Sequence, residues 1–335
     1  MSKSLAPAIA CFIIDGMTIS FFDAAQVEGL LDYPGCIDAV REAMIALSSG
    51  ERPQPLRQIF TVGDGQAFGT MPGELQALST FGAKLVSVFG EPGKAGRSRH
   101  RGVVVAYDGK TGEVNCIADA EPITQIRTGC ASAVATDALA RRDSEVLAIF
   151  GTGIQAEAHL RAVPLVRRFR EILLWGRSAD KAREFAARVG EEIGRPIVPL
   201  ESAEEAASRG DVICTVTSSA DPVLFDAWVK DGTHINLVGS SLLGPVEVDP
   251  PLVARARYIA DYRPGALAQG AELAAAREAG VIDDNYFVGE IGEVLAGRVP
   301  GREDDSQVTI YKSLGHVVQD LASAVYLRER AASES

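Results

Sequence analysis

Residues 145–159, EVLAIFGTGIQAEAH, constrain the fold more than any other stretch of this chain. Residues 146–150 form a short apolar run, which is typical of a strand that is buried on both faces. The sequence G-T-G follows at once, and a helical pattern begins directly after it, with Ala156 at the third glycine position of the G-x-G-x-x-G motif. This order of strand, glycine turn and helix is typical of a dinucleotide-binding unit. The alternative is a buried strand with a glycine turn that binds no ligand.

Further strand-like runs alternate with helical segments after this motif. The runs are EILLW at 171–175, the short apolar run at 197–200, DVICTV at 211–216 and the run at 234–238. Strands that alternate with helices in this way predict a parallel sheet with helices on both faces. We therefore predict an α/β fold with a Rossmann doubly wound parallel sheet. Residues 1–120 differ, because there strands alternate with turns.

The composition excludes several classes of function. The net charge of −12 opposes binding to nucleic acid or to an anionic membrane by bulk electrostatics. No apolar run reaches the ~18 residues of a membrane span. The five cysteines are scattered without a CxxC pair, so we expect a reduced cytoplasmic protein with no metal site.

Long motifs are distributed over nearly the whole chain, and they resemble those of one family. The motifs are PLR at 55–57, MP at 71–72, AKLV at 83–86, IRTGCASAVAT at 126–136, GTGIQA at 151–156, VTSS at 216–219, GTHINLVGSS at 232–241, GEIGEVLAGRVPGRE at 289–303 and TIYKSLGHVVQDLA at 309–322. Through them the chain resembles the ornithine cyclodeaminase and mu-crystallin family from about residue 21 to residue 328.

The resemblance implies a division into two domains. A substrate-binding and dimerisation domain of α+β type would comprise residues 1–126 and 307–335, so that the C-terminal helix completes it. The Rossmann domain, residues 127–306, would be inserted between these parts. The resemblance also implies a homodimer that forms through the N-terminal domain.

The resemblance implies a reaction at the α-carbon of a 2-imino acid, which gains or loses a hydride. Arg57 matches the family's arginine for the substrate carboxylate, and Lys84 matches its catalytic lysine. A guanidinium binds a carboxylate bidentately, and a partly desolvated lysine can act as acid or base. Without the motifs, each cation reads more simply as a surface or strand-edge residue. The substrate-binding residues that we expect are Arg57, Met71 and Arg99, with Lys84 as the catalytic residue.

One departure from the family motifs bears on the reaction. The cyclodeaminases use an aspartate as general base, and the matching position here is Ser241. A serine without a neighbouring base does this work poorly at neutral pH. We therefore predict an NAD(P)H-dependent imine reductase or amino-acid dehydrogenase that acts on small imino or amino acids. The alternatives are a cyclodeaminase-type ammonia lyase and a non-catalytic, crystallin-like NADP-binding protein.

The end of the second Rossmann strand bears on the choice between NADP and NAD. An NAD-binding strand commonly ends in an acidic residue, whereas here Trp175 and a glycine are followed by Arg177 and Ser178. An arginine and a hydroxyl can hold a 2′-phosphate, which favours NADP; stacking of Arg177 on the adenine would admit either cofactor. The cofactor-binding residues that we expect, partly from the family motifs, are Arg127, Gly151, Gly153, Ile154, Gln155, Arg177, Ser178, Thr217, Asn236, Val238 and Ser313.

A basic cluster lies between two predicted strands of the N-terminal region, in a segment that resembles one bordering the family's active site. The cluster exceeds what one substrate carboxylate requires, so it could hold a second carboxylate, as in iminosuccinate. A solvated loop or a dimer contact is the alternative. Its members are Lys94, Arg97, Arg99, His100 and Arg101.

Overall fold

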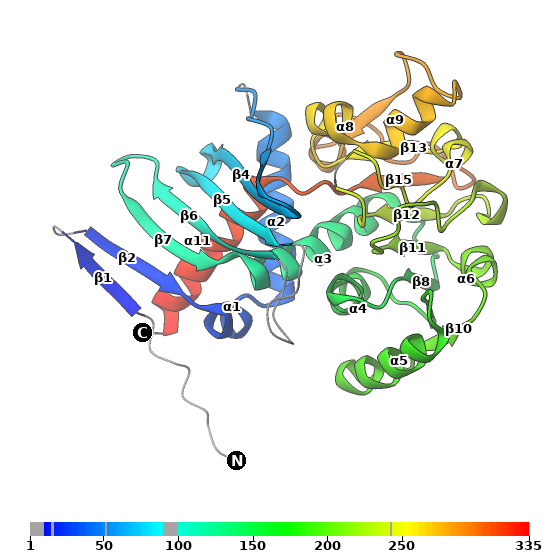
Figure 1. The fold of residues 1–335 in the computed structure, drawn as a ribbon, viewed down its shortest axis with the longest axis horizontal. Coiled ribbons are helices and arrows are strands. Elements are labelled where there is room, and N and C mark those ends of the chain that lie inside the picture. The colour runs from blue at the N-terminus through cyan, green and yellow to red at the C-terminus, as the bar shows by residue number, and fades with distance from the viewer. Residues whose placement is uncertain (1–9, 15–16, 51, 90–99, 242, 335) are drawn as a thin grey trace. The chain divides into compact units, whose positions relative to one another are not determined.

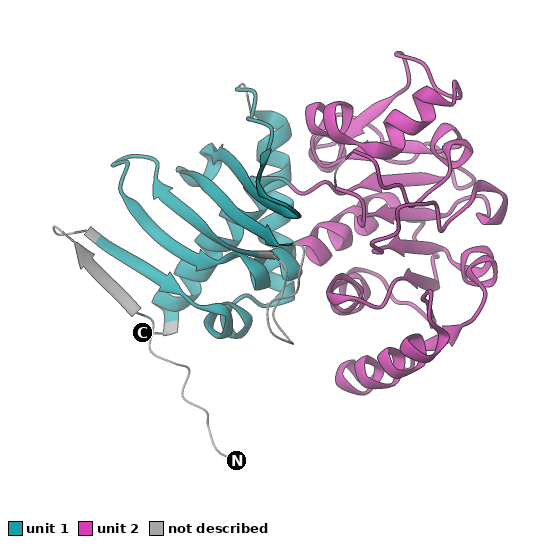
Figure 2. Ribbon diagram, in the orientation of Figure 1, with its two compact units in different colours: residues 1–127, 316–335 teal, residues 128–315 magenta. Residues whose placement is uncertain are grey.

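The computed structural model describes residues 10–14, 17–50, 52–89, 100–241 and 243–334. The chain forms two compact units, which Figure 2 shows in different colours. Unit 1 contains residues 1–127 and 316–335, and unit 2 contains residues 128–315. Within the described part of the chain, no helix is both long enough and apolar enough to cross a membrane.

Unit 1 is a seven-stranded sheet with helices on one face (Figure 1). The strand order is β1-β2-β7-β6-β5-β4-β3; β2 and β7 are parallel, and the other pairs are antiparallel. Helix α11 packs against β4, β5, β6 and β7, and α2 packs against α11. The strands are β1 (Ala10–Ile14), β2 (Met17–Phe22), β3 (Gln58–Gly63), β4 (Gln66–Leu75), β5 (Thr80–Phe89), β6 (His100–Asp108) and β7 (Val114–Asp119).

The helices of unit 1 begin and end where local chemistry favours it. Asp23 caps α1 by accepting from the Gln26 amide, and Asp32 caps α2 in the same way from Gly35. Apolar residues of α2 at helical spacing, such as Ile37, Val40 and Met44, are buried. The helices are α1 (Ala24–Leu30), α2 (Tyr33–Ser49), the short 3₁₀ helix η1 (Gln76–Leu78) and α11 (Val317–Glu334), and α3 (Ala120–Leu139) begins here and continues into unit 2.

Unit 2 is a parallel eight-stranded sheet with the order β10-β9-β8-β11-β12-β15-β13-β14. The strand order reverses between β8 and β11, which makes this the switch point of a doubly wound fold. All five residues of β8 are buried, as the apolar run predicts. The strands are β8 (Val146–Phe150), β9 (Glu171–Trp175), β10 (Val198–Leu200), β11 (Val212–Thr215), β12 (His234–Leu237), β13 (Arg257–Ala260), β14 (Val288–Glu290) and β15 (Thr309–Lys312).

Helices connect the strands of unit 2, and two apolar clusters fill its core. One cluster includes Phe150, Ile235 and Ile310, and the other includes Ile149, Leu160 and Val189. The helices are α4 (Ile154–Val166), α5 (Ala179–Ile193), α6 (Ala203–Arg209), η2 (Asp226–Trp228), α7 (Pro250–Arg255), α8 (Arg263–Gln269), α9 (Ala271–Glu278) and α10 (Ile291–Leu295).

The predicted fold class is confirmed, because unit 2 is a doubly wound parallel sheet and lies in sequence between the two segments of unit 1. The expected domain boundary at 306/307 differs from the boundary between the compact units, which falls at 315/316. The reason is β15, which pairs with β12 and β13 inside the unit 2 sheet. The roles that we assign to the two domains stay predictions.

Candidate active site

Two of the expected substrate-binding residues and the expected catalytic lysine belong to one row of the unit 1 sheet. Met71 on β4 pairs with Lys84 on β5, and Arg57 stands one residue before Gln58, which pairs with Thr70. Paired residues of antiparallel strands point to the same face. The register therefore brings Arg57, Met71 and Lys84 into one line across the sheet.

Lys84 is a buried cation with two hydrogen-bond partners. Its side chain is 4% exposed, and Nζ donates to Asp320 Oδ1 at 3.1 Å and to Thr124 Oγ1 at 3.3 Å. Burial, followed by the charge of Arg127, lowers the pKa of Lys84 to about 8, although Asp320 opposes this shift. An amine with this pKa is mostly protonated at neutral pH and still releases its proton readily.

Asp320 joins Lys84 to the buried guanidinium of Arg127. Arg127 donates from Nε to the same Oδ1 atom at 3.1 Å and from Nη1 to Gln319 Oε1 at 2.8 Å. The Asp320 side chain is fully buried, so its charge is compensated by the two cations rather than by water. The family resemblance predicts that Arg127 lies near the cofactor and the substrate. In the structure its guanidinium binds Asp320 and Gln319 of helix α11, within unit 1.

Asp320 is a residue that our reading of the sequence missed. Helix α11 and the residue before it carry polar side chains at the spacing i, i+3, i+4 and i+7, and all four are buried. This row of buried polar side chains along one face of the helix is the signal that could have revealed the site. Its members are His316, Gln319, Asp320 and Ser323.

Arg57 is half-buried, and its positive charge contributes to the lowered pKa of Lys84. The two cations therefore lie within electrostatic reach of each other. A carboxylate bound by Arg57 would stand in the same row of the sheet as the lysine amine. This arrangement suits a substrate in which a carboxylate is attached to the reacting carbon.

The basic cluster is only partly within the described residues. Lys94, Arg97 and Arg99 lie outside them, so the assignment of Arg99 to the substrate stays a prediction. Arg101 belongs to β6 and pairs with Ser87 on β5. Side chains alternate along a strand, so Ser87 and Arg101 lie on the face opposite to Lys84. The strand register thus places Arg101 away from Lys84, and a second carboxylate held by the basic cluster stays a prediction.

The glycine turn of unit 2 has the space that a dinucleotide needs. Gly151 has a φ of +126°, and a Cβ atom there would lie 2.9 Å from the Val216 carbonyl oxygen, so only glycine fits. Gly153 is the N-cap of α4, and among the described residues no atom lies within 4 Å of the Cβ that it lacks. No side chain of the described residues caps this helix end. A helix N-terminus without a side-chain cap, beside open space, fits a pyrophosphate.

The end of β9 places Arg177 and Ser178 at the start of α5. Both are exposed, and the Ser178 hydroxyl caps the helix by accepting from the Lys181 amide at 3.4 Å. Ile154, at the start of α4, is also exposed, with 54% of its surface accessible. These positions are open to a ligand on the carboxyl side of the sheet.

The remaining expected cofactor residues differ in accessibility. Thr217 donates from its amide and its hydroxyl to Glu247, at 2.7 Å each. Asn236 is fully buried, and its side-chain amide donates to Thr136 Oγ1 at 2.9 Å. This side chain therefore stabilises the core of unit 2. Gln155, Val238 and Ser313 lie in the expected segments: Gln155 in α4, Val238 directly after β12 and Ser313 directly after β15.

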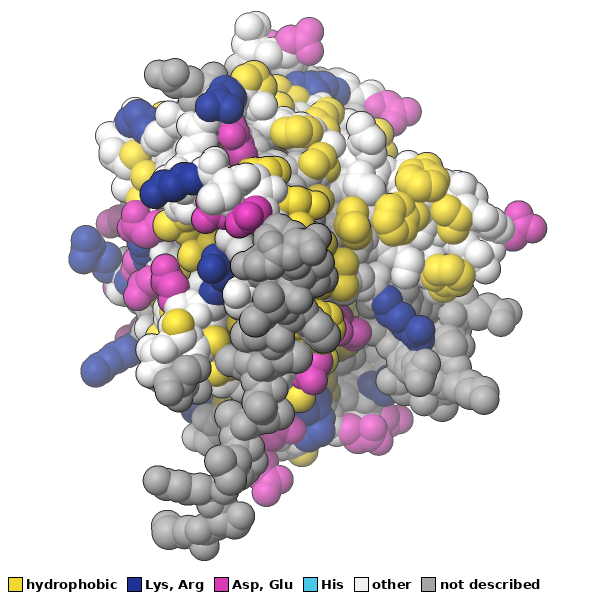
Figure 3. Space-filling view, turned by 90° about the vertical axis from the view of Figure 1, so that its left-hand side faces the viewer, with side chains coloured by type: hydrophobic (Ala, Val, Ile, Leu, Met, Phe, Trp, Pro, Cys, Tyr) yellow, Lys and Arg dark blue, Asp and Glu magenta, His cyan; other side chains and the backbone are white. Residues whose placement is uncertain are grey.

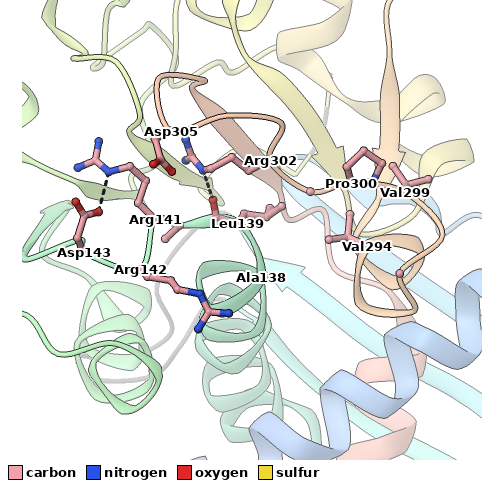
Figure 4. A pocket seen from close by; sticks show the side chains of 13 residues that line it. Ala138, Leu139, Arg141, Arg142, Asp143, Val294, Val299, Pro300, Arg302 and Asp305 are labelled. Carbon is pink, nitrogen blue, oxygen red and sulfur yellow. Dashed lines mark hydrogen bonds and ion pairs between the residues drawn. The ribbon is translucent and has the colours of Figure 1, made fainter.

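A pocket of about 780 Å³ lies at the opposite edge of unit 2 (Figure 4). Two of its arginines already have protein partners: Arg302 donates to the Leu139 carbonyl at 2.9 Å, and Arg141 donates to Asp143 and Asp211. Asp211 precedes β11, so the pocket lies at the amino ends of the strands, where Rossmann folds do not bind their cofactor. Among the described residues, no three His, Cys, Asp or Glu side chains are grouped as a metal site.

Comparisons with known proteins agree with this geometry. The Ornithine cyclodeaminase/mu-crystallin family matches residues 18–335. A Delta(1)-pyrroline-2-carboxylate reductase of Bacillus cereus is 35% identical over 92% of this chain and 95% of its own length.

Two solved structures are similar over nearly their whole length. The Delta(1)-pyrroline-2-carboxylate reductase of Thermococcus litoralis, in complex with NADH and L-proline, is 31% identical with a TM-score of 0.88, over 94% of this chain and 98% of that one. The iminosuccinate reductase of Paracoccus denitrificans, in complex with NAD+, is 30% identical with a TM-score of 0.87, over 94% and 96%. The chain is a member of the ornithine cyclodeaminase/mu-crystallin family.

Proposed function

We propose that the protein is an NAD(P)H-dependent reductase that converts a small 2-imino acid into an L-amino acid. The observation that carries this proposal is the buried Lys84 amine, held by Asp320 in the same sheet row as Arg57. The reaction requires a proton donor for the imine nitrogen and a cation for the carboxylate. These two side chains supply both.

The chain's own residues perform the acid-base part of this reaction. Arg57 binds the substrate carboxylate and fixes the orientation of the C=N bond. Lys84 Nζ donates a proton to the imine nitrogen; an N–H bond forms there as the N–H bond of the lysine breaks. When bound, the reduced nicotinamide supplies the hydride that the α-carbon gains. Lys84, now neutral, is reprotonated from solvent.

We place a cyclic monocarboxylic imine, such as Δ1-pyrroline-2-carboxylate, first among the substrates. The relatives named for this substrate support the choice. The position of Arg101 on the far face of the sheet also favours a substrate with a single carboxylate. Iminosuccinate, which the Paracoccus relative is named for, is the second candidate.

The cofactor proposal is NADP or NAD, bound at the glycine turn. Arg177 and Ser178 support NADP, whereas the two structural relatives were solved with NADH or NAD+. Measuring the Kd of NADPH and of NADH for the wild type and for Arg177→Ala decides between them. If Arg177 holds a 2′-phosphate, the variant weakens NADPH alone; equal weakening of both would indicate stacking on the adenine.

A homodimer is proposed through the uncovered face of the unit 1 sheet. This face, opposite to Lys84, carries exposed apolar side chains, and Figure 3 shows apolar groups gathered on the face that is turned to the viewer. A second copy that covers them would remove this surface from water. A monomeric mass by light scattering at micromolar protein would contradict the proposal. The exposed residues include Phe60, Val62, Phe81 and Phe89.

The test of the proposed function is an assay of NADH and NADPH oxidation. The substrates are preformed Δ1-pyrroline-2-carboxylate, oxaloacetate with ammonia, and pyruvate with ammonia. Rapid oxidation with an imine supports a reductase. Release of ammonia from L-ornithine without net cofactor oxidation would instead indicate the lyase. We do not expect this result, because Ser241 stands at the position of the general-base aspartate of the cyclodeaminases. Cofactor binding without either reaction would indicate the non-catalytic alternative.

A further inference from the structure

A buried carboxylate holds together the two chain segments that follow β11 and β12. Glu247 is fully buried. Its Oε1 accepts from the amide and the hydroxyl of Thr217, both at 2.7 Å, and its Oε2 accepts from Thr215 Oγ1 at 2.9 Å and from the Gly239 amide at 2.7 Å. One side chain thus fixes backbone amides of both segments at the carboxyl edge of the sheet.

The backbone of Glu247 is fixed as well. Its carbonyl oxygen accepts from the amides of Val223 at 2.9 Å and Leu224 at 3.1 Å. A Cβ atom on Gly239 would collide with the Thr217 carbonyl oxygen and with the Glu247 side chain. The two segments therefore pack as closely as backbone allows, with the carboxylate between their amides.

A buried lysine, Lys312, also binds the segment that follows β12. Its Nζ donates to the Ser240 carbonyl oxygen at 2.6 Å and forms a buried ion pair with Glu272 at 2.8 Å. The positive charge of Lys312 also favours the ionised form of Glu247, whose pKa is raised mainly by burial. Lys312 and Glu247 are both fully buried, so their charges stabilise the local backbone and do not contact solvent.

The segments after β11 and β12, which Glu247 joins, lie beside the glycine turn. A Cβ on Gly151 would touch Val216, the residue directly before Thr217. A Rossmann fold binds a dinucleotide across its switch point, and the ribose recognised at the end of the second strand belongs to the adenosine half. The segments after β11 and β12 therefore belong to the nicotinamide half of the site.

We propose that Glu247 is a positioning residue that shapes the nicotinamide half of the cofactor site. It does so by holding the segments at Thr217 and Gly239 together. This inference rests on the proposed function, because it assumes that the glycine turn binds a dinucleotide. It assigns to Glu247 no contact with the cofactor itself.

The same sheet supplies a matched control at its opposite edge. Asp211 accepts from the amides of Glu145 at 2.8 Å and Val146 at 2.9 Å, and it pairs with Lys230 at 2.7 Å. It is therefore a carboxylate that joins segments at the amino ends of the strands. Asp211→Asn removes a comparable set of hydrogen bonds far from the glycine turn.

The experiment compares the binding of NADH with that of AMP, which carries only the adenosine half, by calorimetry on the full-length protein. In Glu247→Gln the new NH₂ group cannot accept hydrogen bonds, so we expect the Kd of NADH to rise by about tenfold. The Kd of AMP stays unchanged. Asp211→Asn lowers Tm but changes neither Kd. If Glu247→Gln does not fold, Thr215→Val removes one contact and raises the NADH Kd alone, by about threefold.

Two results would overturn the inference. If the Glu247 variant binds NADH as the wild type does, or loses AMP and NADH affinity equally, the carboxylate has no specific role at the nicotinamide half. Failure of the wild type to bind NADH and NADPH would overturn the proposed cofactor and this inference with it. The wild-type titration separates the two failures.

Discussion

The candidate site of unit 1 and the glycine turn of unit 2 are built in different ways. In unit 1, charged side chains from distant segments meet in a buried cluster around Asp320. In unit 2, one contiguous turn offers backbone amides and the space left by missing side chains. We propose that the first arrangement controls protonation, and that the second binds an anion without any titratable group. Substitutions in unit 1 should therefore change kcat or the substrate KM, whereas substitutions in the glycine turn should change the cofactor Kd.

The largest effect is expected from Lys84→Ala. Loss of the proton donor should lower kcat by ~100-fold or more, because general acid catalysis contributes at least that much. The Kd of the cofactor should stay the same, since the glycine turn is untouched. Steady-state kinetics and calorimetry measure the two quantities, and Lys110→Ala, in an exposed turn, is the matched control. A variant that keeps a tenth of the wild-type rate would rule out this role for Lys84.

Arg57→Met should raise the substrate KM without changing the cofactor Kd. Losing a charge-assisted contact with a carboxylate costs about 1.5–3 kcal/mol, which corresponds to about 10- to 150-fold. Arg52→Met, at an exposed arginine of the same segment, should change neither constant. Equal weakening of substrate and cofactor would break the distinction between the two sites.

Asp320→Asn tests whether the unit 1 cluster works through charge. Asp320 raises the pKa of Lys84 against the effects of burial and Arg127. Without it the pKa falls below about 8, so the protonated, active amine is lost at lower pH. We expect the alkaline limb of the kcat/KM profile to move to lower pH, with about a tenfold loss at neutral pH. An unchanged profile, like that expected for the exposed Asp38→Asn, would contradict this role.

Gly153→Ala should affect cofactor binding alone. The added methyl group meets no atom of the described residues, so Tm should stay within a few degrees, while the cofactor Kd rises by about tenfold. Gly151→Ala should behave differently, because its positive φ and the nearby Val216 carbonyl make any side chain costly to the fold. If both variants bind NADH normally, the turn is not the cofactor site.

The same contrast explains which features could be predicted from the sequence. The glycine turn is contiguous, so its strand, turn and helix are legible in one window of residues. Lys84 and Arg57 stand out only through motif resemblance. Asp320 pairs with Arg127 and Lys84, which lie 193 and 236 positions earlier in the chain. The polar stripe of α11 could have indicated that Asp320 belongs to a site, but it does not specify these two partners.

Strand register and strand pairing explain the other differences between the predictions from the sequence and the structure. Arg101 faces away from Lys84 because of its position along β6, which a sequence without strand pairing does not specify. Likewise, β15 belongs to the unit 2 sheet because it pairs with β12 and β13. Both facts depend on contacts between strands that are distant in sequence.

The fate of the transferred hydride tests the proposed imine reduction and the role of Lys84 together. Δ1-pyrroline-2-carboxylate is incubated with the protein and reduced cofactor deuterated at the transferable position, and the product is analysed by mass spectrometry. We expect L-proline with a single deuterium at its α-carbon. We also expect Lys84→Ala to form this product at least ~100-fold more slowly. A product without deuterium, or equal rates for the two proteins, would contradict the proposed imine reduction with Lys84 as the proton donor.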